Sequence, residues 1–467
     1  METERAMVPA VRDELVAACP VVREGGPQDA IAGVVASFIA SPASTDEASE
    51  LLRVAAAHDL AVVPRGAGTG LGWGAPPARC DLIIDLQAMD QVIEHAAGDL
   101  VARVQAGTTI GHLASVLAAA GQQLALDAPA DATVGGVVAT GTAGPRRFRY
   151  GAPRDLLIGI TVVRADGVVA HSGGKVVKNV AGYDLGKLFA GSQGTLGVIT
   201  EVTFRLHPLS AAVAWITGDF GPADLAGAAS AVASAAGSAL VPSAVELDWS
   251  GGSPRGPRVL RLGVLLEGTP SGVAERARQM SELLESAGAN LTAALSKVPF
   301  RWWETVPETG SPSTVVRVTF WVRRLGEVFN ALAAAGASAG VRPAVSGPAG
   351  AGLLYACLDP LTEPDAAARF VRELRDRLSG GQGGSPGQGG SGGWRPPDPG
   401  GSGGASGFVP PGPTLPRGSV TVLAAPPPVL AAAGAYGAVP GASLMRAIKD
   451  QFDPGHRMFP GRMTGGS

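Results

Sequence analysis

The sequence predicts an α+β protein in which a glycine-rich, ligand-binding domain precedes a domain built on an antiparallel sheet. Two observations support this fold class. Residues 31–209 hold three clusters of glycines among short apolar runs that have the pattern of β-strands. Residues 210–378 alternate Ala-rich helical segments with apolar strands, which is typical of helices packed on an antiparallel sheet.

The expected elements of the first domain follow hydrophobic periodicity and local stop signals. Ser44 and Glu47 have the spacing of a capping box, and Thr108-Thr109 is expected to cap a second helix. Pro64 is expected to end the strand before it. The expected strands are 31–39, 60–63, 82–86, 100–106, 156–164, 168–170 and 198–206, and the expected helices are 44–58 and 110–120.

In the second domain the same signals predict strands at 213–217, 259–266 and 314–322 and helices at 222–236, 274–287 and 364–378. Residues 379–418 are dominated by Gly, Ser, Pro and Gln and cannot bury enough apolar surface to fold, so we expect a disordered insertion there. A strand at 419–425 and a helix at 444–452 follow it.

The first glycine cluster, 64–74, contains five glycines and begins at the end of an apolar run. Such a loop brings main-chain N–H groups against an anion, and Arg65 adds positive charge, so a phosphate is the expected ligand. The loop is not a Rossmann fingerprint, because Leu71 stands where the third glycine belongs. It is not a P-loop either, because it lacks the lysine. A glycine-rich turn without a ligand remains the alternative.

The second and third glycine clusters span 132–144 and 191–197. Small residues at 132–144 suit a main chain lying against an extended ligand, and equally a tightly packed strand and turn. Four arginines follow the second cluster: Arg146, Arg147, Arg149 and Arg154. They indicate either a solvated or partner-facing edge or a site for a phosphate or carboxylate.

Composition excludes several classes of function. The net charge of −3, from 37 basic and 40 acidic residues, gives no sign of nucleic-acid binding. No apolar run approaches the roughly 20 residues of a transmembrane helix, and the N-terminus lacks the order of a signal peptide. The three cysteines, Cys19, Cys80 and Cys357, are scattered, so we expect no metal site and a cytoplasmic protein.

Taken together, the motifs resemble the flavin-binding domain of the vanillyl-alcohol-oxidase, or p-cresol-methylhydroxylase (PCMH), superfamily. Within it they are most similar to the FAD-binding E subunits of bacterial glycolate oxidase (glycolate dehydrogenase). The resemblance rests on segments 63–69 with 73–74, 132–136, 144–151, 173–185, 194–199 and 448–463. It is dense over about 31–208 and again over 444–463, whereas the middle is similar only in composition.

The resemblance implies a PCMH-type two-subdomain FAD-binding domain with an α+β cap domain. The implied division is a peripheral N-terminus (1–30), the FAD-binding domain (31–209), the cap or substrate-side domain (210–378), the disordered insertion (379–418), the end of the cap (419–443) and a C-terminal segment that returns to the FAD domain (444–467).

The resemblance also assigns roles to individual residues. It places around the FAD pyrophosphate Pro64, Arg65, Gly66, Ala67, Gly68, Thr69 and Gly70. Along the ribityl and phosphate side it places Thr133, Gly135, Gly136, Thr140 and Gly144. Beside the isoalloxazine and ribose it places Gly194, Gly197, Val198 and Ile199. Covalent members of the superfamily carry a histidine in the first loop. Thr69 stands in that neighbourhood here, so we expect non-covalent FAD.

The chain departs from the relatives that oxidise 2-hydroxy acids by themselves. Those relatives, which resemble the D subunit, carry a His-x-His pair and a Gly-Asp-Gly-Asn-x-x-His motif in the second domain, whereas this chain has no histidine between His207 and His456. Imidazole suits removal of a hydroxyl proton near neutral pH. The remaining candidates for catalysis near the flavin are Tyr183, Lys175 and Lys178. The tail also has Phe459-Pro-Gly where the family usually has Asn-Pro-Gly.

The resemblance therefore implies an FAD-binding subunit of a multi-subunit 2-hydroxy-acid dehydrogenase, with glycolate as the expected substrate. Its expected partners are a second, D-type flavoprotein and an F-type iron–sulfur subunit, since three cysteines are too few to hold a [4Fe–4S] cluster. The complex would be cytoplasmic or peripheral at the inner face of the membrane. Two alternatives are a stand-alone FAD-dependent alcohol or sugar oxidase and a non-catalytic architectural subunit.

Overall fold

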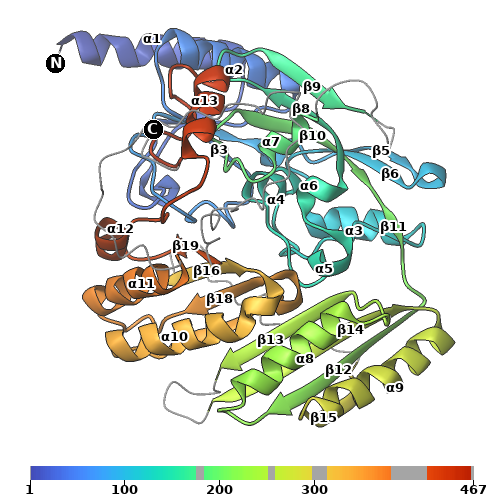
Figure 1. Cartoon of the computed structure of the whole chain (residues 1–467). Helices are drawn as coiled ribbons and strands as arrows, with labels where there is room; N and C mark the ends of the chain where they lie inside the picture. The colour runs from blue at the N-terminus through green and yellow to red at the C-terminus, as the bar shows by residue number, and fades with distance from the viewer. Residues whose placement is uncertain (1, 175–183, 251–257, 297–312, 380–417, 464–467) are drawn as a thin grey trace, which may run out of the picture.

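The computed structural model describes residues 2–174, 184–250, 258–296, 313–379 and 418–463 (Figure 1). Helices and strands are mixed, and the strands form sheets of four, five, two and eight members. The α+β class predicted from the sequence is confirmed. The insertion predicted at 379–418 lies outside the described residues except at its two ends.

The smallest of the three larger sheets lies near the N-terminus. Its strands have the order β1-β2-β4-β3 and comprise β1 (Val22–Glu24), β2 (Phe38–Ala40), β4 (Leu82–Asp85) and β3 (Val62–Arg65). β2, β4 and β3 are parallel, and β1 is antiparallel to β2. Helix α1 (Glu2–Ala18) packs on α2 (Thr45–Ala57), which begins as expected after Ser44, whose side chain accepts a hydrogen bond from the Glu47 N–H.

A second, antiparallel sheet completes the first half of the molecule. It contains β5 (Val92–Ala96), β6 (Val101–Gln105), β10 (Val198–Arg205), β8 (Leu157–Val163) and β9 (Val169–Gly173) in that order. The helices around it are α3 (Ile110–Ala118), α4 (Val134–Thr140), α5 (Arg147–Tyr150), α6 (Pro153–Leu156) and α7 (Gly186–Phe189). β7 (Gln122–Gln123) pairs with β11 (His207–Pro208) where the chain leaves this half.

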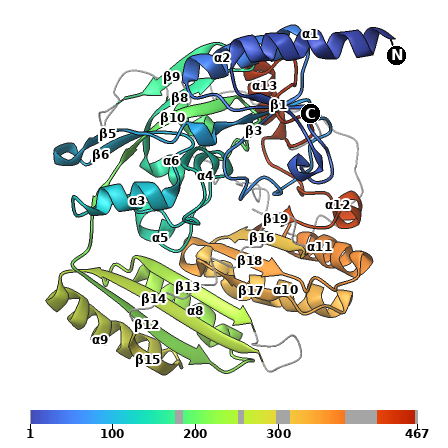
Figure 2. The ribbon, with the colours of Figure 1, turned by 180° about the vertical axis from the view of Figure 1, so that it is seen from behind.

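The second half is an eight-stranded antiparallel sheet with helices on one face (Figures 1 and 2). Its strands are, in order, β15 (Asn290–Ser296), β12 (Ala212–Phe220), β14 (Val259–Gly268), β13 (Ala244–Ser250), β17 (Ala344–Gly347), β18 (Leu353–Cys357), β16 (Val315–Phe320) and β19 (Gly418–Ala424). The helices on it are α8 (Leu225–Gly237), α9 (Pro270–Ser286), α10 (Leu325–Ala339) and α11 (Pro364–Leu378). Its other face is turned toward the first half, with α5 against β13.

Short 3-10 turns and two C-terminal helices complete the chain. The turns are η1 (Pro27–Asp29), η2 (Leu86–Ala88), η3 (Ala97–Asp99), η5 (Val322–Arg324) and η6 (Ala349–Ala351). Helix α12 (Pro427–Ala433) packs on α11, and α13 (Ala442–Phe452) crosses back to lie beside the N-terminal half in both ribbon views.

Two large apolar cores correspond to the two halves. One is built from residues between Ala214 and Val429, and the other from residues between Val11 and Leu206 together with Met458. The division near residue 209 agrees with this grouping, and the full set of domain boundaries remains our prediction.

Several elements differ from the sequence-based expectation, and three examples lie in the first half. Only the last residues of the strand expected at 31–39 form a strand, which is the start of β2. The first residues form a tight turn, with an Ile31–Val34 bridge and Gly33 at φ +90°. Helix α1 was not expected, yet it buries Val11 and Leu15. Strand β3 continues through Pro64 to Arg65, because it lies at the edge of its sheet, where a proline removes no ladder hydrogen bond.

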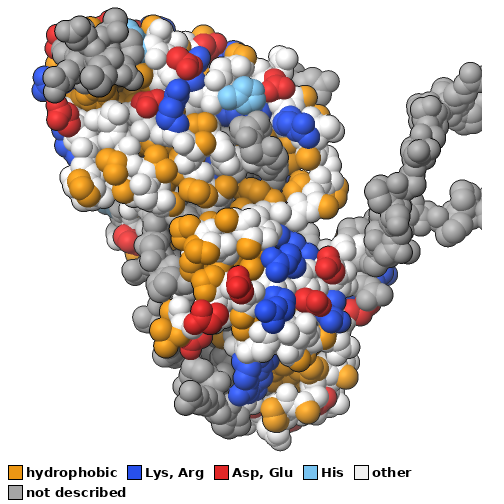
Figure 3. All heavy atoms as spheres, turned by 90° about the vertical axis from the view of Figure 1, so that its left-hand side faces the viewer, with side chains coloured by type: hydrophobic (Ala, Val, Ile, Leu, Met, Phe, Trp, Pro, Cys, Tyr) orange, Lys and Arg blue, Asp and Glu red, His pale blue; other side chains and the backbone are white. Residues whose placement is uncertain are grey.

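Charge on the surface is mixed. Figure 3 shows one face of the molecule, on which Lys and Arg side chains lie among Asp and Glu without a large patch of one sign. No helix among the described residues has the length and apolar character needed to cross a bilayer.

The C-terminal segment is fastened to the first half by a fully buried ion pair. Lys449 Nζ lies 2.6 Å from Asp453 Oδ2 and donates to the main-chain carbonyls of Thr195 (2.7 Å) and Met458 (2.8 Å). Burial lowers the pKa of Lys449, and the Asp453 carboxylate opposes this shift. The tail also adds main-chain bonds to the open edge of β3, from Val62 N–H to Arg457 O and from Phe459 N–H to Val62 O.

Replacing one partner of this pair is expected to destabilise the protein strongly. Lys449→Met leaves the Asp453 carboxylate buried without its cation, which costs about 3–5 kcal/mol of unfolding free energy. The double variant K449M/D453N removes both charges and should lose less. Chemical denaturation of the three proteins measures the difference, and equal losses in the single and double variants would contradict this role.

Candidate functional site

The three glycine-rich segments meet at one cavity, whose wall also includes Phe459 and Arg462 of the C-terminal tail. Thirteen of the sixteen residues proposed for the cofactor line it: Pro64, Arg65, Gly66, Gly68, Thr69, Gly70, Thr133, Gly135, Gly136, Thr140, Gly194, Gly197 and Ile199. Segments more than 120 residues apart in the chain are thus brought to one place.

Main-chain atoms form much of the wall, because the first loop lies directly against helix α4. A Cβ at Gly66 would fall 2.0 Å from Thr133 Oγ1, and one at Gly70 would fall 2.8 Å from Thr140 Cγ2. Gly68 has φ +81°, which disfavours any side chain, and a Cβ there would meet no protein atom within 4 Å. Glycine is therefore required by packing at the first two positions and by conformation at the third.

The second glycine cluster is a helix and not the strand and turn considered from the sequence. Thr133 caps α4 by accepting a hydrogen bond from Gly136 N–H, and Gly141 ends the helix in a left-handed conformation. A Cβ at Gly135 would lie 2.7 Å from Ala106 Cβ, so this glycine lets α4 pack closely on β6. The cap and the close packing offset the low helix propensity of two adjacent glycines.

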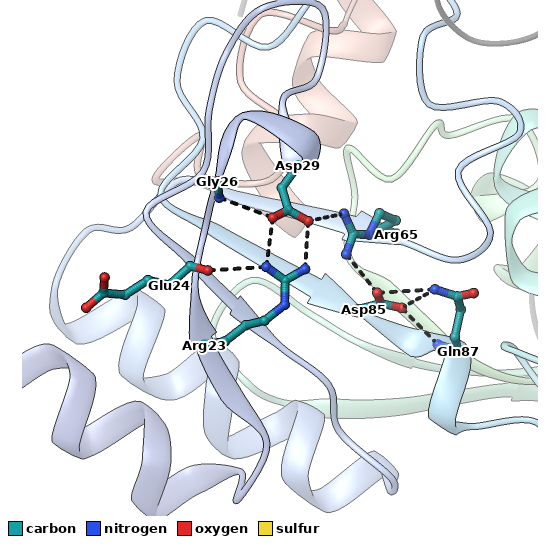
Figure 4. A network of polar contacts seen from close by, with 7 residues as sticks. All are labelled: Arg23, Glu24, Gly26, Asp29, Arg65, Asp85 and Gln87. Atoms are coloured by element: carbon teal, nitrogen blue, oxygen red, sulfur yellow. Dashed lines mark hydrogen bonds and ion pairs between the residues drawn. The ribbon is translucent and has the colours of Figure 1, made fainter.

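Arg65 lines the cavity but is already paired (Figure 4). Its guanidinium contacts Asp29 Oδ1 at 3.1 Å and Asp85 Oδ2 at 2.8 Å, and Asp29 also receives two bonds from Arg23. Hydrogen bonding from Arg23 holds the pKa of Asp29 well below its usual range, with a smaller contribution from Arg65. Arg65 therefore ties the glycine loop to its sheet in addition to facing the ligand space.

Two residues of the C-terminal tail complete the wall and were not identified from the sequence. Arg462 is almost fully buried, lies 3.9 Å above the Phe459 ring, and donates to the carbonyls of Leu71 (2.6 Å) and Trp73. Burial lowers its pKa to about 10, so it remains a cation at neutral pH. The segment 448–463 was the available signal, but no local pattern places its arginine beside the first glycine loop.

Three proposed cofactor residues lie elsewhere. Ala67 is exposed and Val198 is buried in the apolar core of the first half, and neither lines the cavity. Gly144 lines a second cavity, where a Cβ would lie 2.6 Å from Asp127 Cβ. The catalytic candidates Lys175, Lys178 and Tyr183 lie outside the described residues.

The arginine cluster is divided between different environments. Arg146 is committed to Asp127, at 2.7 Å, and Arg149 reaches Ser243 of the cap. Arg154 is exposed. Of the four arginines, only Arg147 lines the second cavity, of about 380 Å³, which lies between the two halves of the molecule. The four arginines therefore do not lie together along one shared edge.

Comparison with known proteins agrees with this geometry. Residues 36–173 match the family model described as FAD binding domain. The chain is 33% identical over 176 residues to the glycolate oxidase subunit GlcD of Bacillus subtilis, covering 36% of this chain and 37% of that protein. It is 37% identical over 169 residues to a probable mitochondrial D-lactate dehydrogenase of Danio rerio, covering 36% and 34%. These matches span little more than a third of each relative.

Solved structures share the fold over most of the chain. The structure of p-cresol methylhydroxylase covers 97% of this chain with a TM-score of 0.71 at 17% identity, and 96% of that chain is covered. An alkyldihydroxyacetonephosphate synthase covers 91% with a TM-score of 0.62 at 16% identity, over 77% of its own length. At such identities the likeness shows the fold alone, and it confirms the PCMH-type architecture expected from the sequence.

The Arg65 network predicts a pH-dependent contribution to stability. The pKa of Asp29 is lower in the folded protein than in the unfolded chain, where it is near 4. The stabilisation that the Asp29 carboxylate gives to the folded state is therefore fully present above about pH 4 and is lost as the pH falls further. Asp29→Ala should lower the unfolding free energy by about 1–3 kcal/mol at pH 7, and the gap to the unmodified protein should shrink below about pH 4. Denaturation at pH 7, 5 and 3.5 measures this gap; a constant gap would contradict the assignment.

Proposed function

Because residues 36–173 match the family model described as FAD binding domain, we propose that this chain is the FAD-carrying subunit of a 2-hydroxy-acid dehydrogenase. Glycolate, oxidised to glyoxylate, is the expected substrate. The observation that carries the proposal is the convergence of three glycine segments on one cavity.

The residues of the cavity fit an anionic dinucleotide. Among the described residues that line it, the charged side chains are Arg65 and Arg462, and no carboxylate is included. Arg462 Nε is buried without a hydrogen-bond partner within the described structure. Main-chain groups of Gly66 to Gly70 supply the kind of surface on which a pyrophosphate is held.

Each part of the wall would have a separate task. The 64–70 loop would hold the pyrophosphate, with Arg65 keeping the loop in register on β4. Thr133, Gly136 and Thr140 would lie along the ribityl chain, and Gly194, Gly197 and Ile199 beside the ring system. FAD supplies hydride acceptance from the alcohol carbon, and the protein supplies binding, orientation and exclusion of water. We expect the FAD to be non-covalent, since Thr69 stands where covalent relatives have histidine.

Relatives named as glycolate oxidase, D-lactate dehydrogenase and D-2-hydroxyglutarate dehydrogenase support a 2-hydroxy acid as the substrate class. The E-subunit identity, the D-type flavoprotein partner and the F-type iron–sulfur partner form part of the proposal, as does a cytoplasmic or inner-membrane-associated complex. The absence of histidine between residues 208 and 455 favours a subunit over a stand-alone oxidase.

Flavin binding is expected to depend on Gly66. Gly66→Val introduces atoms that collide with Thr133 Oγ1 and moves the loop, so the purified variant should lose flavin absorbance near 450 nm by at least about 10-fold. Gly98→Ala is the matched control, because a Cβ at Gly98 meets nothing within 4 Å. Circular dichroism establishes that both variants are folded, and a flavin-loaded, folded Gly66→Val protein would contradict the loop assignment.

Activity is tested by anaerobic reduction of the flavin with glycolate, with the chain alone and with its proposed partners. We expect a yellow protein whose flavin is reduced efficiently only in the complex. Rapid reduction of the isolated chain would support the stand-alone oxidase, and a colourless chain that still assembles with the partners would support the architectural role.

A further inference from the structure

The second cavity brings together cationic and phenolic side chains from both halves of the molecule. Arg147 comes from α5 of the FAD-binding half, whereas Arg317 on β16 and Tyr355 on β18 come from the sheet face of the cap. The first cavity lies next to it, since Trp73 and Thr140 line both. A molecule held here is therefore adjacent to the proposed cofactor.

The two arginines are not neutralised within the described part of the chain. Neither Arg147 nor Arg317 forms an ion pair with a described residue, and Arg317 Nε is buried without a hydrogen-bond partner. The one carboxylate in the described lining, Asp127, is bound by Arg146. Removing cations from water without an anionic partner is costly, and a bound anion would offset that cost.

Tyr355 adds a hydrogen-bond donor to the same place. Burial raises the pKa of Tyr355, an effect that Arg317 and Arg147 oppose and buried Glu246 reinforces. The phenol therefore remains protonated at neutral pH. A protonated phenol donates to a carboxylate or hydroxyl oxygen and does not act as a base under these conditions.

From this arrangement we propose that Arg147 and Arg317 bind the carboxylate of a small 2-hydroxy acid across the interface between the two halves, with Tyr355 donating a third hydrogen bond. The inference rests on the proposed function and deepens it, because it assigns substrate recognition to three residues of this chain. The substrate class follows from the chemistry: two guanidinium groups select a carboxylate over a neutral alcohol or sugar.

Oxalate, an unreactive carboxylate of glycolate's size, is the probe. Its dissociation constant is measured on the flavin-loaded protein, in the complex with its partners, by titration of the flavin absorbance and by calorimetry. Arg147→Met and Arg317→Met should each weaken oxalate binding about 10- to 100-fold. Lysine at either position should restore part of the affinity, and Tyr355→Phe should cost less than either methionine variant.

Arg154→Met is the matched control, since Arg154 belongs to the same sequence cluster but is exposed and outside this cavity. The proposal is overturned if both cavity variants bind oxalate as tightly as the unmodified protein, or if Arg154→Met loses as much affinity as they do. It is also overturned if the unmodified protein does not bind oxalate. Flavin content separates the two hypotheses. A flavin-loaded protein with unaltered oxalate affinity refutes the carboxylate site alone, whereas a protein without FAD refutes the proposed function.

Discussion

The buried Lys449–Asp453 pair is the interaction on which the cofactor site depends most. Lys449 joins three separate pieces of chain: its own helix, the third glycine segment through Thr195, and the tail through Met458. With the tail held in this way, Phe459 and Arg462 reach the first glycine loop. A buried ion pair contributes little more to the free energy of folding than apolar residues of similar volume would. The main effect of the Lys449–Asp453 pair is therefore to fix one arrangement of these segments.

Much of the cofactor site could be predicted from the sequence because its requirements are local. Gly66 has no room for a side chain beside Thr133, and Gly68 has a positive φ. Both conditions require glycine, so they can be recognised from the sequence. The helix caps at Ser44 and Thr109 were predictable for the same reason. These features depend on neighbouring residues and little else.

The features that the sequence did not reveal depend on distant parts of the chain. Nothing near Arg65 indicates that Asp29 and Asp85 occupy its guanidinium, and nothing near Arg462 indicates that Leu71 and Trp73 receive its hydrogen bonds. The helical state of Val134–Thr140 depends on packing against β6, which outweighs the propensity of its glycines. Likewise, Arg147 differs from the other arginines of its cluster in lining the second cavity, and this depends on the cap strands opposite it.

The position of Arg462 close to the C-terminal end of the sequence has a consequence for biosynthesis. Domains generally fold as units from the N-terminus while the chain is still being made. All three glycine segments and their sheets are complete by residue 205, but part of the cavity wall is supplied more than 250 residues later. The cap must therefore be synthesised before this cavity closes, so we expect tight binding of a ligand there only after the segment that contains Arg462 has been made.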